Sequence, residues 1–355
     1  MSDFYRGKRV LVTGHTGFKG AWLTRILVNS GARVCGYALE PETWPNLFAL
    51  SGVEKDIRHV LGDIRDFGHL QDVFASFRPE LVFHLAAQPI VRESYARPLY
   101  TYETNVMGTA NVLEAIRQTP SVGSAVIVTT DKVYRNDESG RRFREEDVLD
   151  GFDPYSNSKS CAELVTACYK RSFPSLPPIS TARAGNVIGG GDYAKDRIIP
   201  DCVRAVQRGE PILVRNPHSV RPWQHVLEPL FAYLLIAEKQ FQSPQLAGSY
   251  NIGPEEEDCI TTGELVNLFC EKWGEGAAWI DGSAPGGPHE AGLLRLDCAR
   301  MKQTFGWQPC WKIRDCIGQV VRFTKEWMQG GASVPAEMEK EIYEFRSKLT
   351  ILCKK

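Results

Sequence analysis

The chain of 355 residues is long enough to bury a large core in one large or two unequal domains. Its 42 basic and 43 acidic residues give a net charge of −1, which offers no electrostatic support for a nucleic-acid or membrane-surface partner. No apolar run is long enough to span a bilayer, and the polar N-terminus predicts no signal peptide.

The ten cysteines are scattered along the chain. None forms a C-x-x-C pair or lies at zinc-ligand spacing from a histidine, so we expect no metal site. Most lie in apolar patterns, where a free cysteine acts as a small hydrophobic residue. This usage predicts a reducing, cytoplasmic compartment.

A glycine-rich turn follows the first predicted strand, at residues 8–13, and opens a helix that reaches about residue 30. Glycines in such a turn let backbone N–H groups approach a pyrophosphate, and the helix N-terminus favours negative charge. Lys19 could equally be solvated or hold a phosphate. The predicted cofactor contacts of the turn are Gly14, Thr16, Gly17, Phe18, Lys19 and Gly20.

The second and third strands end in residues suited to the adenosine half of a cofactor. Glu40 follows the strand at 33–39 with no Arg or Lys close behind, which favours NAD over NADP, although a surface glutamate fits nearly as well. Asp63, with Ile64 beside it, is placed to accept from the adenine amino group. Asp66 fits a helix N-cap.

The fourth strand, at 81–88, ends in small residues that allow close approach of a flat cofactor, so Leu85, Ala86 and Ala87 are predicted cofactor contacts. Gln88, at its end, is a predicted substrate contact. His84 lies within the hydrophobic strand and fits a core histidine better than a catalytic one. A long helix follows at 99–118, in which Asn105 is expected to bind cofactor, a backbone loop or a catalytic water.

The next buried strand, at 125–128, ends in Thr129, Thr130, Asp131 and Lys132. In an open parallel sheet, chemistry collects where strands end. Two hydroxyls, a carboxyl and an amine at such a point indicate a reaction centre, with Thr129 on its cofactor side.

A helix beginning near residue 154 carries Tyr155 and Lys159 on one face, since they are four residues apart. The phenol of tyrosine ordinarily has a pKa of about 10. A lysine ammonium one turn away and a cationic nicotinamide ring would favour the phenolate. The phenolate could then remove a proton from a sugar hydroxyl.

Together these motifs resemble the extended short-chain dehydrogenase/reductase superfamily over nearly the whole chain. The residues that carry the resemblance are Gly14, Gly17, Gly20, Asp63, Ala86, Ala87, Asn105, Thr130, Tyr155 and Lys159. The pair Asp131-Lys132 narrows the resemblance to one group within the superfamily. Sugar-nucleotide 4-epimerases usually carry small or hydroxyl residues at these two positions, and most 4,6-dehydratases carry Asp-Glu. With residues 184–192, 215–217 and 221–226, the pair is similar to the CDP-glucose 4,6-dehydratases.

The resemblance implies the substrate CDP-glucose, the cofactor NAD and a role for each catalytic residue. Tyr155 and Thr130 would act at the C4 hydroxyl, Lys132 would remove the C5 proton, and Asp131 would protonate the leaving C6 hydroxyl, while Lys159 would bind the nicotinamide ribose. An Asp131–Lys132 ion pair that only holds the loop is the structural alternative. Other functions left open are another nucleotide-sugar 4,6-dehydratase, a 4-epimerase, and a catalytically silent NAD-binding regulator.

Apart from Gln88, the predicted substrate contacts lie in the second half of the chain. Asn186 can donate to a diphosphate, as its family position implies, and guanidinium groups bind phosphate oxygens bidentately. We expect Trp223 to pack and His225 to be structural. The predicted substrate contacts are Gln88, Asn186, Arg197, Arg215, Arg221 and His289.

We therefore expect an α/β fold: a Rossmann-type doubly wound parallel sheet with a smaller, mostly C-terminal α/β substrate domain. The NAD-binding domain is placed at 1–185, with later segments returning to it, and the substrate domain at 186–355. The long helices around 102–116 and 156–169 resemble those of a four-helix dimer interface in the superfamily, so a homodimer or higher homo-oligomer is expected.

Overall fold

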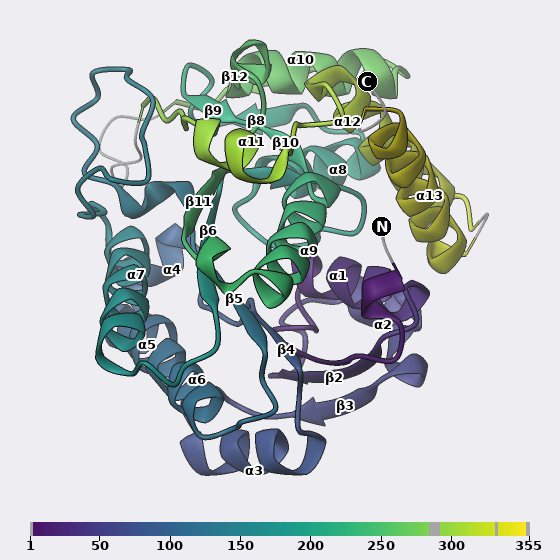
Figure 1. Cartoon of the computed structure of the whole chain (residues 1–355). Helices are drawn as coiled ribbons and strands as arrows, with labels where there is room; N and C mark the ends of the chain where they lie inside the picture. Colours follow the sequence, from purple (N-terminus) through teal and green to yellow (C-terminus); the bar gives the residue numbers. More distant parts are fainter. Residues whose placement is uncertain (1–2, 284–291, 331–332, 353–355) are drawn as a thin grey trace.

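The computed structural model of the chain describes residues 3–283, 292–330 and 333–352, and its centre is a seven-stranded sheet (Figure 1). The strand order is β11-β6-β5-β4-β1-β2-β3, and every neighbouring pair is parallel. This confirms the predicted doubly wound α/β fold. The strands are β1 (Arg9–Thr13), β2 (Arg33–Ala38), β3 (Arg58–Leu61), β4 (Leu81–His84), β5 (Ser124–Val128), β6 (Ile179–Ala184) and β11 (Ser249–Ile252).

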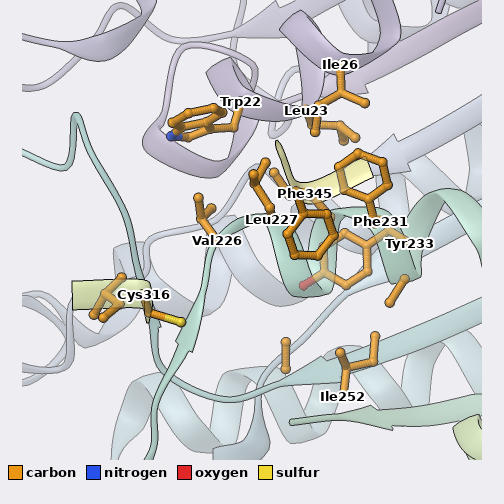
Figure 2. Packing of buried hydrophobic residues seen from close by; sticks show 14 of the residues in the cluster. Trp22, Leu23, Ile26, Val226, Leu227, Phe231, Tyr233, Ile252, Cys316 and Phe345 are labelled. Atoms are coloured by element: carbon orange, nitrogen blue, oxygen red, sulfur yellow. The ribbon is translucent and has the colours of Figure 1, made fainter. Parts of the chain in front are cut away.

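Successive strand residues point to opposite faces of the sheet and build two separate cores. Val10 and Val12 of β1 belong to the core under α1 (Phe18–Asn29) and α9 (Leu227–Gln242), which Figure 2 shows. Leu11 belongs to the other core, under α3 (Phe67–Phe77) and α6 (Gly108–Arg117). Because helices cover both faces, the strands read as continuous apolar runs.

The helix predicted at 99–118 is not one regular helix. It consists of α5 (Pro98–Tyr102), a π-helical segment (Glu103–Met107) and α6. Asn105 lies in the π-helical segment, and its side chain bonds the backbone of Gln88. Sequence periodicity did not reveal this local change, because a π-helical segment of five residues is too short to alter the apolar spacing of the whole stretch.

The remaining elements lie mainly around the carboxyl end of the sheet and its α9 side. They include α7 (Pro154–Ser172), α8 (Ile198–Arg208), α10 (Thr262–Trp273), α11 (Ala299–Phe305), α12 (Ile313–Met328), α13 (Val334–Leu352) and the short α2 (Leu47–Ser51) and α4 (Val91–Ala96). Three two-stranded sheets pair β7 (Val187–Ile188) with β10 (Gln224–His225), β8 (Ile212–Val214) with β13 (Trp279–Asp281), and β9 (Val220–Pro222) with β12 (Cys259–Thr261). Within the described residues, no helix is long and apolar enough to cross a membrane.

The helix N-cap predicted at Asp66 is confirmed. Asp66 accepts a hydrogen bond from the backbone of His69 at the start of α3. Thr261 and Glu264 form a reciprocal capping box at α10. Trp223 and His225 are buried, as a packing role requires.

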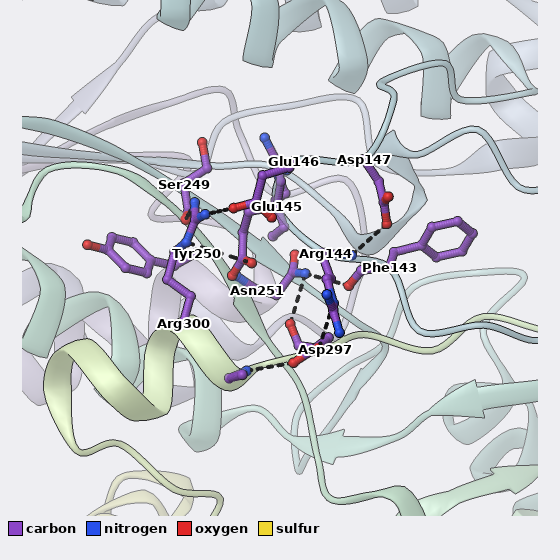
Figure 3. Close-up of polar contacts among 12 residues, drawn as sticks. Phe143, Arg144, Glu145, Glu146, Asp147, Ser249, Tyr250, Asn251, Asp297 and Arg300 are labelled. Atoms are coloured by element: carbon purple, nitrogen blue, oxygen red, sulfur yellow. Dashed lines mark hydrogen bonds and ion pairs between the residues drawn. The ribbon is translucent and has the colours of Figure 1, made fainter.

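Asn251, on edge strand β11, anchors the loop that follows the predicted reaction centre (Figure 3). Its amide nitrogen donates to the carbonyl oxygens of Phe143 (2.9 Å) and Asp297 (3.1 Å). Its amide oxygen accepts from the Tyr134 hydroxyl at 2.6 Å, and its backbone N–H donates to Glu145 at 2.8 Å. The chain after Tyr134 is therefore tied to the sheet edge.

We predict that Asn251→Ala lowers the free energy of unfolding by about 2 kcal/mol, because it removes three buried hydrogen bonds and leaves polar groups without this partner. Guanidinium titration followed by tryptophan fluorescence measures the loss. Asn267→Ala is the matched control, because Asn267 is exposed and makes one surface bond to Trp279. Equal stability of the two variants would contradict the anchoring role.

Candidate active site

The parallel register brings the ends of the central strands to one edge. Thr13 of β1 pairs with His84 of β4, and His84 pairs with Ile127 of β5. The glycine-rich turn, the loop after β4 and the polar run after β5 therefore leave the sheet side by side. This is the position expected for a ligand site in an open parallel sheet.

The glycine-rich turn packs directly on the backbone of the β4 loop. Gly14 has φ +77°, and a Cβ there would lie 2.6 Å from the Ala86 nitrogen. A Cβ on Gly20 would lie 2.0 Å from the Gly14 oxygen, so glycine is required at both positions. Gly17 caps α1 without a side-chain acceptor, which leaves the N–H groups of the first helical turn without a side-chain cap.

His84 is buried and satisfied, as predicted. Its Nε2 lies 3.0 Å from the Thr109 hydroxyl, which donates its own proton to the Asn105 carbonyl oxygen. Nε2 must therefore carry the proton, and Nδ1 accepts from the Thr13 hydroxyl at 2.7 Å. Burial lowers the pKa of His84 to about 3, so the ring stays neutral.

Asn105 and Gln88 hold the loop after β4. The Asn105 amide nitrogen donates to the Gln88 carbonyl oxygen (3.0 Å) and the Ser158 hydroxyl (2.9 Å). The Gln88 amide donates to Thr101 at 2.8 Å and accepts from the backbone of Ile90 at 2.5 Å. This binding of a backbone loop is one of the roles expected for Asn105. Gln88 is used inside the protein here, and its contact with substrate stays a prediction.

Asp63 has a partner that the sequence did not suggest. Its carboxylate accepts hydrogen bonds from the Arg65 guanidinium, the shortest at 2.6 Å. Although partial burial raises the pKa of Asp63, these bonds lower it below its usual value. Neighbouring Ile64 is buried against Gly108, where a Cβ would lie 2.5 Å from Ile64 Cδ1. The adenine contacts of both residues stay predictions.

The Asp131 carboxyl is 2 % exposed at the end of β5. Its Oδ1 accepts from the Thr130 hydroxyl at 3.0 Å, and the buried Oδ2 has no hydrogen-bond partner among the described residues. Burial raises the pKa of Asp131, although the nearby charges of Lys132, Arg221 and Lys19 lower it. The protonated form of this carboxyl is therefore more accessible than that of an aspartic acid in water.

Tyr155 and Lys159 come from α7, whose first turn is capped by the Asp153 carboxylate. The Lys159 ammonium donates to the Val128 carbonyl oxygen at 3.0 Å, beside the end of β5. Burial lowers the pKa of Lys159 to about 8. Burial raises the pKa of Tyr155 to about 12, and the Thr130 hydroxyl acts in the opposite direction.

Three cations from separate elements meet at this centre. Lys19 of α1 acts electrostatically on Asp131, as does buried Arg221 of β9. Arg197 acts on Tyr155 and on Lys19, and it pairs with Asp192 at 3.1 Å. Sequence reasoning treated Lys19 as a phosphate ligand or a solvated group and did not foresee its proximity to the acid.

The other predicted substrate contacts are placed as follows. Arg215 pairs with Asp196 (2.7 Å) and Asp201 (3.1 Å) on a partly exposed surface. The backbone carbonyl oxygen of Asn186 accepts from Gln224 at 3.1 Å, which joins it to β10. His289 lies outside the described residues.

The sequence did not indicate two residues that the structure places at this centre, a glycine and a glutamate. A Cβ on Gly185 would lie 2.6 Å from Pro222 Cγ and 3.2 Å from Asp131 Oδ2. Glu163 of α7 is buried, and its carboxylate accepts a hydrogen bond from the Thr129 hydroxyl at 2.5 Å. Glu163 stands in an ordinary helix pattern, which gives no signal of this contact. Gly185 follows β6 in the run 184–192 that carried the resemblance, but nothing in that run indicates contact with Asp131.

Comparison with known proteins gives a consistent result. Residues 11–320 match the family model described as GDP-mannose 4,6 dehydratase. The chain is 43% identical to a CDP-glucose 4,6-dehydratase of Salmonella typhimurium, over 98% of this chain and 99% of the relative. It is similar to the crystal structure of a Thermus thermophilus UDP-glucose 4-epimerase complex with NAD (TM-score 0.78, 27% identity, 89% and 99% of the two chains). It also has the fold of a Bacillus anthracis dTDP-glucose 4,6-dehydratase (TM-score 0.77, 23% identity, 92% and 99% covered).

Proposed function

We propose that this chain, which belongs to the GDP-mannose 4,6 dehydratase family of extended short-chain dehydrogenases/reductases, removes water from CDP-glucose with NAD as cofactor. The product is CDP-4-dehydro-6-deoxyglucose. Identity to the Salmonella typhimurium CDP-glucose 4,6-dehydratase over nearly the full length supports the reaction class and the sugar. The structural observation that carries the proposal is the buried Asp131 carboxyl, whose free oxygen lies in the same site as Tyr155.

The residues around the glycine-rich turn fit NAD. At two glycine positions of the turn a Cβ would collide with backbone, so no side chain projects from the turn there. The first turn of α1 has N–H groups without a side-chain cap, and these can bind a pyrophosphate. Thr16, Phe18, Leu85, Ala87 and Thr129 border this region in the chain and are the proposed further contacts. When bound, NAD takes up a hydride from C4 of the hexose and later returns it to C6.

Tyr155 is the base for the C4 hydroxyl proton. A phenolate is required, and the hydrogen bond with Thr130 favours it. The Lys159 ammonium, one helical turn away, has a pKa of about 8 and is largely charged at neutral pH. The charge of Arg197 lowers the pKa of Tyr155 against burial, and we propose that the Lys159 ammonium, on the same helix face as Tyr155, adds to this effect.

Asp131 and Lys132 carry the elimination. A 4-ketone acidifies the C5 proton, which Lys132 removes, and Asp131 gives a proton to the departing C6 hydroxyl, so that water leaves. Burial already favours the protonated form of Asp131. No direct ion pair joins the two side chains among the contacts of the described residues, which leaves each available for its own proton transfer.

Incubation with CDP-, dTDP-, UDP- and GDP-hexoses followed by mass spectrometry tests the function. Dehydration of CDP-glucose gives a product lighter by one water, whereas epimerisation leaves the mass unchanged. Dehydration of another nucleotide sugar in preference to CDP-glucose would overturn the assignment of cytosine as the nucleobase of the substrate. Tight NAD binding without turnover of any hexose would identify a silent regulator.

A homodimer is the proposed assembly. Apolar side chains stand exposed on neighbouring helices that lie on the α6 side of the sheet: Leu99 of α5 is 78% exposed, Met107 of the π-helical segment 57%, and Leu164 of α7 55%. These elements lie together in Figure 1. The nine described cysteines are all free, which supports a cytoplasmic location as a further proposal.

Lys132→Ala is expected to stop the reaction after oxidation, with turnover lowered at least about a hundredfold because the C5 base is lost. Solvent deuterium incorporation at C5, measured by NMR of recovered sugar, should disappear. Tyr155→Phe is the companion variant and should block oxidation itself. Undiminished deuterium incorporation in Lys132→Ala would refute the assignment.

Gly185→Ala is expected to slow water loss by about tenfold or more, since the added Cβ crowds both Pro222 and Asp131 Oδ2 and displaces the acid. Oxidation at C4 should be preserved, which single-turnover absorbance of the reduced nicotinamide measures. Gly253→Ala, directly after the neighbouring strand β11, is the control, because its Cβ would meet nothing nearer than 3.5 Å. An unchanged ratio of oxidation to elimination would argue against this crowding.

Leu99→Glu combined with Leu164→Glu should yield monomers, because two charges would be buried without partners in the proposed interface. Light scattering gives the mass. Leu213→Glu, at a comparably exposed position (54%) on β8, should leave the mass unaltered. Retention of the dimer by the double variant would place the interface elsewhere.

A further inference from the structure

Glu163 is a buried carboxylate in the catalytic helix that the proposed reaction does not use. It lies one turn after Lys159 in α7 and is 2 % exposed. Its Oε1 accepts from the Thr129 hydroxyl at 2.5 Å, and its Oε2 accepts from the Thr181 hydroxyl at 2.7 Å and from Arg183 Nη2 at 2.8 Å. Burying a charge is costly, so three donors converging on it show that the site is built around this carboxylate.

Two of its neighbours belong to the reaction centre. Thr129 directly precedes Thr130, so the Oε1 bond fixes the chain where it enters the catalytic loop. Lys159 is on the same helix four residues earlier, and its ammonium is held at the end of the same strand by the Val128 carbonyl oxygen. Glu163 therefore bonds the residue that follows β5 and lies one helical turn from Lys159.

We propose that Glu163 is a positioning residue for the oxidation step, keeping Lys159 charged beside Tyr155 and holding Thr129 at the entrance of the catalytic loop. This inference rests on the function proposed above. Its physical basis is that the carboxylate supplies negative charge next to an ammonium that has been withdrawn from water.

The other groups facing Lys159 do not supply that charge. His84 of β4 is neutral, and Lys19 of α1, whose pKa is lowered to about 7 by burial and by the charges of Arg197 and Lys159, carries no negative charge in either form. Desolvation lowers the pKa of Lys159, and the negative charge of Glu163 opposes this by raising the same pKa. Loss of the Glu163 charge would therefore leave burial unopposed and favour neutral Lys159.

The groups facing Glu163 hold it in place. Arg183 of β6 also donates to the Tyr134 hydroxyl (2.9 Å) and the Glu145 carbonyl oxygen (3.0 Å), and Lys170 acts on Glu163 from the same helix. Tyr134 in turn bonds Asn251, whose contacts appear in Figure 3. The carboxylate is thus fixed through Arg183 to the loop anchored on β11.

Glu163→Gln tests the proposal, because it keeps the shape and removes the charge. Thr181→Val is the matched control, since it removes a hydrogen bond to the same carboxylate and leaves the charge. The rate of nicotinamide reduction in a single turnover with CDP-glucose is measured as a function of pH. In Glu163→Gln, the apparent pKa of the acid-side limb of the rate profile should rise by about one unit. At pH values below that pKa, the rate should then be about tenfold lower than in the wild type. In Thr181→Val, the apparent pKa should stay at the wild-type value.

A second readout does not depend on activity. ¹⁵N NMR titration of the lysine amines, with the Lys159 signal identified by its loss in Lys159→Met, should give a midpoint near 8 in the wild type. The midpoint should fall in Glu163→Gln and be unchanged in Thr181→Val. Glu163→Asp retains the charge and should recover part of the wild-type pH profile.

If Glu163→Gln fails to fold because Arg183 is left unpaired, the double variant Glu163→Gln with Arg183→Met removes both buried charges and should show the same two shifts. A lower melting temperature with an unshifted rate profile and an unshifted Lys159 midpoint would overturn the positioning role. Absence of nicotinamide reduction by the wild type with every hexose would instead overturn the proposed function, and the NMR titration would still decide the effect on Lys159.

Discussion

Parallel pairing of β1, β4 and β5 is the constraint on which the rest of the structure depends. The pairing of Thr13 with His84, and of His84 with Ile127, makes three strands end at one level. The glycine-rich turn can then rest on Ala86, and the polar run after β5 emerges beside it. A shift of register by one residue would turn the alternating core residues to the wrong face, so the core and the site are fixed together.

Buried polar groups stabilise the loops at this edge. His84 joins β1 to α6 through two threonine hydroxyls, and Asn105 joins the π-helical segment to the β4 loop and to α7. On the other side, Arg183 joins α7 to the loop that Asn251 anchors. Because each of these side chains bonds partners from different elements, movement of one element would break bonds in the others, which favours a preorganised site.

Electrostatics in the site separate the two stages of the proposed chemistry. Burial acts on Asp131 and on Lys159 in opposite senses, because it favours a protonated acid and a deprotonated amine. Glu163 restores charge to the amine, whereas Asp131 remains a buried carboxyl with an unpartnered oxygen. Burial therefore raises the pKa of the Asp131 carboxyl and lowers that of the Lys159 ammonium, and the charge of Glu163 opposes the second shift.

Sequence alone determined the element order, the doubly wound sheet, the cofactor turn and the pairing of Tyr155 with Lys159, because strand and helix periodicities and turn glycines are local properties of the chain. Tertiary structure alone decided that Glu163 lies behind Thr129, that Lys19 acts on Asp131, and that Gly185 makes room beside it. These relations join residues tens of positions apart. They depend on which faces the folded sheet and helices turn toward each other, and no local spacing records that choice.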